Sequence, residues 1–344
     1  MAVTIKDVAR EAKVSVATVS RALNGSASVT VETRRLIDAV AKRLSYVPHA
    51  TARSLITRRT ETVGALLPDL YGEFYSELIR GIDLAARSRG LHLLVSSSHG
   101  SATEAAAALR AMQGRVDGLL IMSPHVDGEF LRNYLPGSLP TVLMNSPATS
   151  TRYSTLNIDN YGGAFAMTQH LIRCGYRKIA LIGGPDGNFD ASERLRGYRD
   201  AVAQSGEPIE SNTYGGDFTE ESGYYASRQM LAMRNRPRAI FASNDMMAVG
   251  ALFALNEAGV RVPEDIALVG FDDIPIAPFV SPPLSTVRVR IANLGRSALE
   301  ELATQLEEHD TTPSPLRTFP CEIVVRASCG ANAFARTHKN TKIA

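Results

Sequence analysis

Short stretches of helical periodicity open the chain. Apolar residues spaced i, i+3, i+4 and i+7 predict a first helix, and they are Ile5, Val8, Ala9 and Ala12. Thr4, with Asp7 three residues later, is typical of the residue that caps a helix N-terminus. Ser15 can cap a second helix, which would bury Val19, Ala22 and Leu23. The stretch from 4 to 24 therefore predicts two short helices joined by a tight turn.

The outer face of the second predicted helix carries small and hydroxyl-bearing side chains and one long cation. These residues are Val16, Ala17, Thr18, Ser20 and Arg21. A helix in the DNA major groove needs such a face, because small side chains admit the backbone, hydroxyls bond phosphates and arginine reads guanine. Any amphipathic helix pair shares this pattern, so helix-turn-helix DNA binding is one hypothesis at this point.

A third helix and a short connector follow. Thr30 can cap the third helix, whose apolar stripe would be Leu36, Ile37, Val40, Ala41 and Leu44. Pro48 suits the first turn of a helix that ends near Leu55, and Arg58 and Arg59 then begin a linker. Two helical turns are too short to persist alone in water, so we expect this helix to form only against a partner.

From residue 62 onward, buried strands alternate with amphipathic helices. This alternation predicts parallel sheets covered on both faces. It begins at 62 and again near 163, which indicates two α/β lobes with a ligand cleft at the carboxyl ends of their strands. The predicted strands are 63–67, 91–95, 118–122, 141–144, 179–182, 239–241, 266–270, 316–319 and 323–325. The predicted helices are 76–88, 103–112, 163–172, 192–203, 221–233, 246–258 and 291–306.

Charge is unevenly distributed along the 344 residues. Residues 1–60 carry a net charge of about +7, and the remainder about −5. A basic head on an acidic body is typical of polyanion binding, although a solvated basic face is the alternative. No apolar run is long enough to span a membrane, and the first residues lack the apolar core of a secretory signal. The three cysteines, Cys174, Cys321 and Cys329, form no CxxC pair, so we expect reduced thiols in the cytoplasm.

Two motifs at the N-terminus give a family resemblance. The run TIKDVAREAKVSVATVSRALNG, followed by RLSYVPHATARSL, resembles the LacI/GalR family of bacterial transcription regulators. The resemblance implies an all-α helix-turn-helix head and a two-lobed α/β body of the periplasmic-binding-protein type I fold. We expect a DNA-binding domain over 1–46, a hinge helix and linker over 47–61, an effector-binding and dimerisation domain over 62–328, and a tail over 329–344. The family implies discontinuous lobes, one of about 62–158 with 291–320, the other of about 161–288 with 322–328.

The same resemblance implies how the head would contact DNA. A dimer would place two recognition helices in successive major grooves of a palindromic operator, with Arg21 reading a guanine. Leu55 would wedge into the minor groove and kink the DNA, with a dimer contact as the alternative role. The tail has no leucine heptad, which favours a homodimer over a tetramer. The expected DNA-binding residues are Thr4, Ser15, Val16, Ala17, Thr18, Ser20, Arg21, Asn24, His49, Ala52 and Leu55.

Polar side chains follow several strands of the predicted body. Carboxylates, amides and an arginine beside aromatic faces suit a polyhydroxylated ligand, but such residues are also common as turns and helix caps. The segments ERLRGY, FASND and VGFDD resemble family motifs, which implies that Arg194, Asn244 and Asp272 contact the effector. Phe218 matches a stacking position. The full candidate set is Asp69, Phe74, Tyr75, Asn188, Asp190, Arg194, Phe218, Asn244 and Asp272.

Enzyme signatures are sparse. The sequence has no P-loop, HExxH or GxSxG, and its seven histidines are scattered, so we expect no catalytic residue, metal or cofactor. We therefore predict a cytoplasmic, nucleoid-associated repressor of a carbohydrate operon, released (or less often tightened) by a mono- or disaccharide. A purine or another metabolite is the alternative effector. A ligand-binding protein without DNA function, or an enzyme on the same scaffold, are the rival classes.

Overall fold

The structure is a computed structural model that describes residues 3–23, 28–46, 59–123, 128–135, 139–147, 153–308, 313 and 315–331. The chain divides into two compact units, which are taken separately. One is Met1–Thr62 with Arg115–Asp117, and the other is Val63–Gly114 with Gly118–Ala344. Among the described residues, no helix is both long and apolar enough to cross a membrane.

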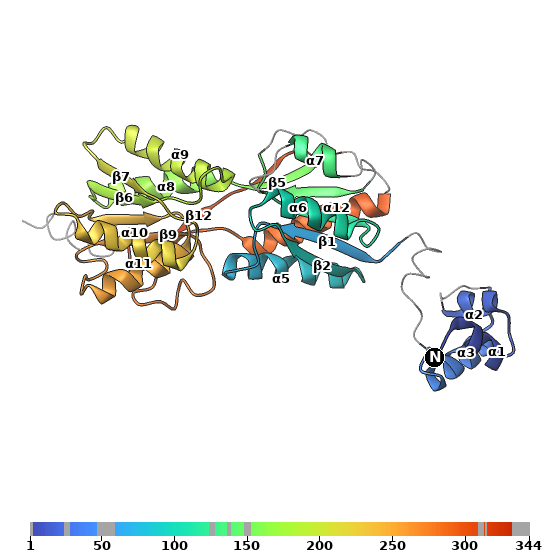
Figure 1. Ribbon diagram of the computed structural model, residues 1–344. Helices are drawn as coiled ribbons and strands as arrows, with labels where there is room; N and C mark the ends of the chain where they lie inside the picture. The colour runs from blue at the N-terminus through green and yellow to red at the C-terminus, as the bar shows by residue number, and fades with distance from the viewer. Residues whose placement is uncertain are drawn as a thin grey trace, which may run out of the picture. The chain divides into compact units, whose positions relative to one another are not determined.

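The described part of the head, residues 3–23 and 28–46, forms the helices α1 (Ile5–Glu11), α2 (Val16–Leu23) and α3 (Val31–Arg43) (Figure 1). The predicted caps are confirmed, since Thr4 N–H donates to the Asp7 carboxylate at 3.0 Å and Thr18 N–H donates to Ser15 Oγ at 3.0 Å. The core is small and centres on the fully buried Val8, Val19 and Ile37. The prediction of a buried Leu36 is wrong. It is 49% exposed, because Ile37, Val40 and Ala41 form the buried face of α3.

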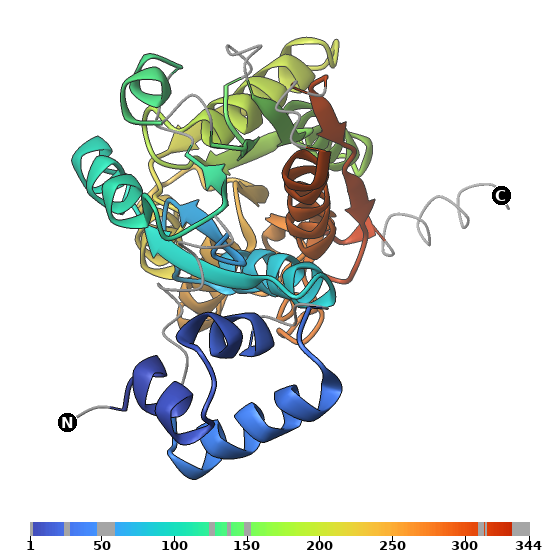
Figure 2. The same cartoon turned by 90° about the vertical axis from the view of Figure 1, so that its right-hand side faces the viewer.

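One sheet of the body has the strand order β11-β5-β4-β3-β1-β2. Its strands are β1 (Thr62–Leu67), β2 (His92–Ser97), β3 (Gly118–Met122), β4 (Thr141–Met144), β5 (Ser154–Ile158) and β11 (Arg317–Phe319). Helices α5 (Glu73–Ser88) and α12 (Ile291–Glu308) pack against each other beside it, as both views show (Figures 1 and 2). Helices α6 (Ala102–Met112) and α7 (Gly128–Tyr134) also contact each other. We call this sheet with its helices lobe 1.

The second sheet has the strand order β12-β10-β9-β8-β6-β7. Its strands are β6 (Lys178–Ile182), β7 (Glu210–Tyr214), β8 (Ala239–Ala242), β9 (Ala267–Asp272), β10 (Ser285–Arg288) and β12 (Glu322–Val324). Only β12, among the registered pairs of this sheet, runs antiparallel to its neighbour. Helices α8 (Asn160–Arg173) and α9 (Phe189–Ala203) cover one face, and α10 (Glu220–Ala232) and α11 (Asp245–Glu257) cover the other (Figure 1). We call this lobe 2.

Within the described residues, the chain passes between the lobes from β5 to α8, from β10 to α12 and from β11 to β12. Each lobe is therefore built from separate parts of the sequence. The predicted fold class, a helical head with a two-lobed α/β body, is confirmed. The first and third crossings start from strands β5 and β11, which pair with each other, so they lie at the same edge of the first sheet.

The hydrophobic pattern did not predict several elements of the body. Strand β7 was missed because its sequence ESNTY is polar and mostly exposed at a sheet edge. Strand β5 was missed although it is buried, because its polar residues find internal partners: Asn157 Nδ2 donates to the Ser146 carbonyl at 2.9 Å. β10 and α7 were missed as well. Helices α5, α8 and α9 each begin three residues before the predicted start, at Glu73, Asn160 and Phe189.

Helices α5 and α12 approach each other unusually closely. A Cβ added at Gly81 would lie 2.1 Å from the carbonyl oxygen of Ala292, and one at Gly295 would lie 2.5 Å from that of Leu78. Each glycine therefore faces the backbone of the opposite helix. This contact fixes α5, whose N-terminal residues border the cavity described next.

Candidate functional site

A cavity of about 560 Å³, counting the part open to solvent, lies between the lobes. Lobe 1 contributes the segment after β1, the start of α5 and the end of β3. Lobe 2 contributes the start of α9, Phe218 before α10, the residues that follow β8 and the last residue of β9. The lining residues are Pro68, Tyr71, Gly72, Phe74, Tyr75, Met122, Asn188, Asp190, Arg194, Phe218, Asn244, Met246 and Asp272.

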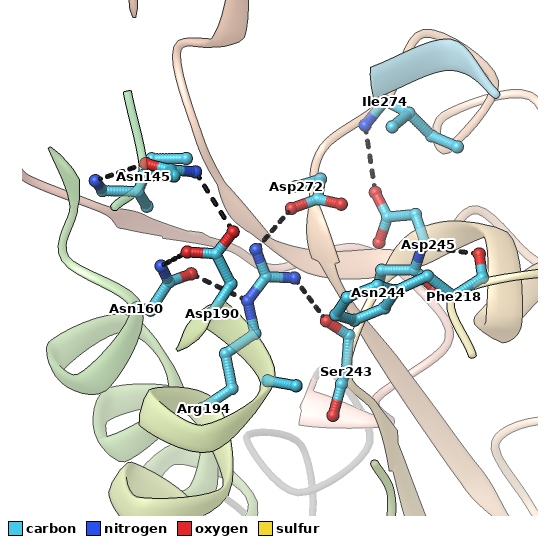
Figure 3. A network of polar contacts seen from close by, with 12 residues as sticks. Asn145, Asn160, Asp190, Arg194, Phe218, Ser243, Asn244, Asp245, Asp272 and Ile274 are labelled. Carbon is cyan, nitrogen blue, oxygen red and sulfur yellow. Dashed lines mark hydrogen bonds and ion pairs between the residues drawn. The ribbon is translucent and has the colours of Figure 1, made fainter. Parts of the chain in front are cut away.

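Arg194 is the centre of the polar network at this cavity (Figure 3). Its side chain is only 4% exposed. Nε donates to Asn160 Oδ1 at 2.8 Å, and Nη1 donates to the Ser243 carbonyl at 2.5 Å. Nη2 forms an ion pair with Asp272 Oδ1 at 3.2 Å. The guanidinium also lies 3.8 Å from the centroid of the Phe271 ring, which covers one of its faces. The arginine is thus rigidly held by its surroundings.

Asp190 lies one turn before Arg194 on α9 and is buried. Its Oδ1 accepts from Asn160 Nδ2 at 2.7 Å, and its Oδ2 accepts from Asn145 Nδ2 at 3.3 Å. Burial raises the pKa of Asp190 to about 6, while Arg194 and the two amides act in the opposite direction. The contact with Asn145 joins lobe 2 to lobe 1, because Asn145 follows β4.

Asp272 ends β9 in a left-handed conformation, with φ of 112°. Burial raises its pKa to about 7; Arg194 opposes this shift and Asp190 adds to it. Its Oδ1 accepts no hydrogen bond from the described residues, and its one close partner is the Arg194 cation. The next residue, Asp273, faces elsewhere and pairs with Arg288 and Arg326. Asp272 thus offers a buried acceptor at the cavity.

Two asparagines at the cavity also cap helices. Asn188 Oδ1 accepts from Ala191 N–H at 3.0 Å at the start of α9. Asn244 Oδ1 accepts from Met247 N–H at 2.9 Å at the start of α11, and its Nδ2 donates to the Phe218 carbonyl at 2.9 Å. The helix-cap and site interpretations of these residues are therefore compatible, and each amide keeps at least one further N–H for a ligand.

The structure gathers eight of the nine candidate effector residues around the cavity. Asp69 is the exception: its carboxylate accepts from the N–H groups of Leu70 at 2.6 Å and Tyr71 at 3.2 Å, which shapes an exposed loop. Phe74, Tyr75 and Phe218 supply the aromatic walls.

Sequence reasoning missed Asn145 and Asn160, the amides that hold Asp190. Asn145 follows β4, so it carries the same signal as the other polar residues at strand ends. Asn160 was hidden because β5, the strand before it, was not predicted. Tyr71, Met122 and Met246 were also missed at the cavity wall. Tyr71 donates its hydroxyl hydrogen to Glu220 of α10, at 3.2 and 3.1 Å from the two carboxylate oxygens.

Asp245, next to Asn244, is fully buried and bonds to elements behind the cavity wall. Its carboxylate accepts from Ile274 N–H at 3.0 Å and from Thr286 Oγ1 at 2.6 Å. Burial and the neighbouring Asp272 raise its pKa well above the ordinary value. These bonds link the start of α11 to β10 and to the turn that directly follows Asp272 at the end of β9.

In the head, α2 exposes Val16, Ala17 and Arg21, while Thr18 and Ser20 are half-buried. Arg21 Nε donates to the Ala17 carbonyl at 3.3 Å, so the guanidinium lies along its own helix. Thr4 and Ser15 have their hydroxyls engaged in the caps of α1 and α2. The remaining candidates, Asn24, His49, Ala52 and Leu55, lie outside the described residues.

A helix-turn-helix head and a two-lobed body with a polar cavity define a ligand-responsive DNA-binding protein. Residues 4–49 match the family model described as "Bacterial regulatory proteins, lacI family", and residues 168–329 match a "Periplasmic binding protein-like domain". The chain belongs to the LacI family of bacterial transcriptional regulators.

Relatives share nearly the whole length of the chain. The repressor PurR of Photobacterium profundum is 35% identical over 94% of this chain and 98% of its own. The ribose operon repressor of Escherichia coli (strain K12) is 36% identical over 92% and 97%. These relatives confirm that the protein is a DNA-binding transcriptional repressor and not an enzyme.

Solved structures of similar proteins have the same fold over nearly the whole chain. The lac repressor dimer bound to operator and the anti-inducer ONPF has a TM-score of 0.85 and 26% identity, covering 96% of this chain and 99% of that one. The complex of the transcriptional regulator CelR with cellobiose has a TM-score of 0.70 and 33% identity, covering 95% and 99%.

Proposed function

We propose that this protein represses a carbohydrate-utilisation operon and is released from its operator by a mono- or disaccharide in the interlobe cavity. The observation that carries the proposal is the composition of the cavity: buried Asp190, Asp272 and Arg194 beside the rings of Phe74 and Phe218. Carboxylates and an arginine bond sugar hydroxyls, and ring faces cover the apolar side of a sugar. The names of two similar proteins, a ribose operon repressor and a cellobiose complex, support the same class.

For the operator, we propose a palindromic site bound by two copies of α2. Arg21 would read a guanine, and Val16 and Ala17 would select bases by shape and methyl contact. Hydroxyl and amide side chains of the head would hold phosphates. Leu55 would wedge into the minor groove and kink the DNA. Because its target is chromosomal DNA, the protein would act in the cytoplasm, at the nucleoid.

The homodimer is supported by exposed apolar residues of lobe 2. Tyr225 on α10 is 57% exposed, Phe253 on α11 is 64% exposed, and Phe279, in the loop between β9 and β10, is 80% exposed. Large exposed apolar side chains on neighbouring elements mark protein interfaces, because they gain most from leaving water. We propose that these elements form the subunit contact.

Effector binding would change operator affinity by altering how the lobes close. A coupling free energy of about 1–3 kcal/mol is typical and changes affinity by about 5- to 150-fold. We propose release by the effector; tightening by a corepressor is the opposite sign of the same coupling. A purine is the second candidate effector, because the rings of Phe74 and Phe218 can also stack on a base.

Two experiments test this function. Selection from a random DNA library should return inverted half-sites, and Arg21→Ala should abolish the sequence preference while Arg35→Ala, an exposed cation of α3, should preserve it. Equal binding to every sequence would refute a specific operator. Thermal unfolding with saccharides and nucleobases should show a rise in Tm with a saccharide only, because a ligand stabilises the state it binds. A rise with nucleobases alone would replace the sugar with a purine.

A further inference from the structure

We propose that the cavity selects uncharged, hydroxyl-rich effectors and rejects the phosphorylated or carboxylated forms of the same molecules. The proposal rests on the cavity being the effector site. It goes further by naming the chemical class that this chain's own charges admit.

The charged groups of the cavity are the first step. Of the described residues that line it, three are charged: Asp190, Asp272 and Arg194. Above pH 7, where the carboxyls of Asp190 and Asp272, with pKa values of about 6 and 7, are mostly ionised, the lining carries a net negative charge. A phosphate or carboxylate on the effector would share this small space with two carboxylates and one cation, and like charges in such proximity cost several kcal/mol.

Arg194, the one cation among the described residues that line the cavity, already has partners for its N–H groups. A phosphate-binding arginine presents two parallel N–H groups to the anion. Here Nε and Nη1 donate to Asn160 and the Ser243 carbonyl, and Nη2 pairs with Asp272. Phe271 covers one face of the guanidinium. An incoming anion would have to compete with a carboxylate for this cation.

Three helices, α5, α9 and α11, begin at the cavity, and each has an acidic residue in its first turn. A helix N-terminus attracts an anion through its unpaired N–H groups and its dipole. In α9, Asn188 caps the Ala191 N–H, and Asp190 places a carboxylate in the first turn. In α11, Asn244 caps the Met247 N–H, and Asp245 is the acid of the first turn. In α5, Gly72 offers no capping side chain, and Glu73 is the acid of the first turn. Of these three acids, Asp190 lines the cavity itself, so a carboxylate already lies beside the N-terminus of α9.

The electrostatic surroundings of Tyr75, in the aromatic wall of the cavity, also indicate an excess of negative charge. Burial raises the pKa of the Tyr75 hydroxyl, and the carboxylates Asp190, Asp69 and Asp272 raise it further, against the opposing effect of Arg194. The negative groups thus outweigh the cation at this wall. Hydroxyl donors, by contrast, meet carboxylate acceptors. Asp272 Oδ1, for example, is paired with the Arg194 cation, and a carboxylate oxygen can accept a further hydrogen bond.

The test compares matched pairs of ligands on the full chain by isothermal titration. The pairs are D-ribose with D-ribose 5-phosphate, D-glucose with D-glucose 6-phosphate, and D-glucose with D-gluconate. At least one neutral sugar should bind, and its anionic partner should bind about 100-fold more weakly or not at all. An anionic partner that binds as tightly would overturn the charge argument but leave the proposed repressor function standing. Binding by none of the neutral sugars would overturn this proposal together with the saccharide effector.

A pair of isosteric variants tests the cause. Asp190→Asn removes one negative charge at the cavity. It should reduce the difference in affinity between a neutral sugar and its anionic partner by about tenfold. Glu193→Gln removes one negative charge from the outer side of the same helix, where Glu193 pairs with Arg196. It should leave the difference in affinity unchanged. Equal effects of the two variants would overturn the proposal. If Asp190→Asn does not fold, the comparison of matched ligands on the wild type decides alone.

Discussion

Replacing Arg194 with alanine should destabilise the body far more than removing an ordinary arginine. The substitution leaves the buried carboxyls of Asp190 and Asp272 without the one cation that lines their cavity in the described structure. Breaking a buried ion pair from one side costs about 3–5 kcal/mol. For a body of this size, the unfolding midpoint should fall by about 6–15 °C. The matched control is Arg196→Ala, on the same helix, where an exposed pair with Glu193 is worth less than about 1 kcal/mol.

The loss of stability that Arg194→Ala causes should also depend on pH. In the wild type, burial raises the pKa of Asp190 to about 6 and that of Asp272 to about 7, so both are largely protonated near pH 5.5. Without the cation these pKa values rise further, and the folded variant binds more protons than the wild type near neutral pH. Its stability therefore falls more steeply as pH rises. Thermal unfolding at pH 5.5 and 7.5 should show the larger deficit at 7.5, by about 1–2 kcal/mol. An equal deficit at both pH values, or one no larger than that of Arg196→Ala, would refute this description of the charge network.

Two further predictions concern the site and the fold. Effector affinity should rise with pH between about 5.5 and 8, by up to tenfold per unit, because hydroxyl donors bind the ionised Asp190 and Asp272 and lower their pKa values from about 6 and 7. Titration at several pH values measures this, and a flat profile would contradict it. Gly81→Ala should cost about 1–3 kcal/mol or more in urea unfolding, because its Cβ would lie 2.1 Å from the Ala292 oxygen. A loss below about 0.5 kcal/mol would show that α5 and α12 separate easily.

The sequence predicts the layers of this fold better than their edges. Runs such as Val63–Leu67 and Ile179–Ile182 become buried central strands because continuous apolar runs have few other solutions. Strand β7 is polar because it lies at an edge, and β5 is polar because its side chains bond internally. Neither state is encoded in local periodicity, since both depend on which neighbours the strand acquires. The prediction that Leu36 is buried is wrong for the same reason, since tertiary packing decides which face of α3 is buried.

The candidate site shows a similar division. Arg194 and Asp272 were identified through motifs that resemble a family, and the structure places their side chains 3.2 Å apart although 78 positions separate them in sequence. The amides of Asn145 and Asn160 had no such motif. Their role arises only when the end of β4 and the start of α8 meet the first turn of α9. Such supporting residues are found from the three-dimensional contacts.

The central claim is that an uncharged ligand in the cavity of the body controls DNA binding by the head. The most direct test measures the Kd for a selected operator with and without a saturating neutral sugar, in the wild type, Arg194→Ala and Arg196→Ala. We predict that the sugar weakens operator binding by about 5- to 150-fold in the wild type and in Arg196→Ala, and leaves it unchanged in Arg194→Ala. The same response in all three proteins, or no response in the wild type, would contradict the account.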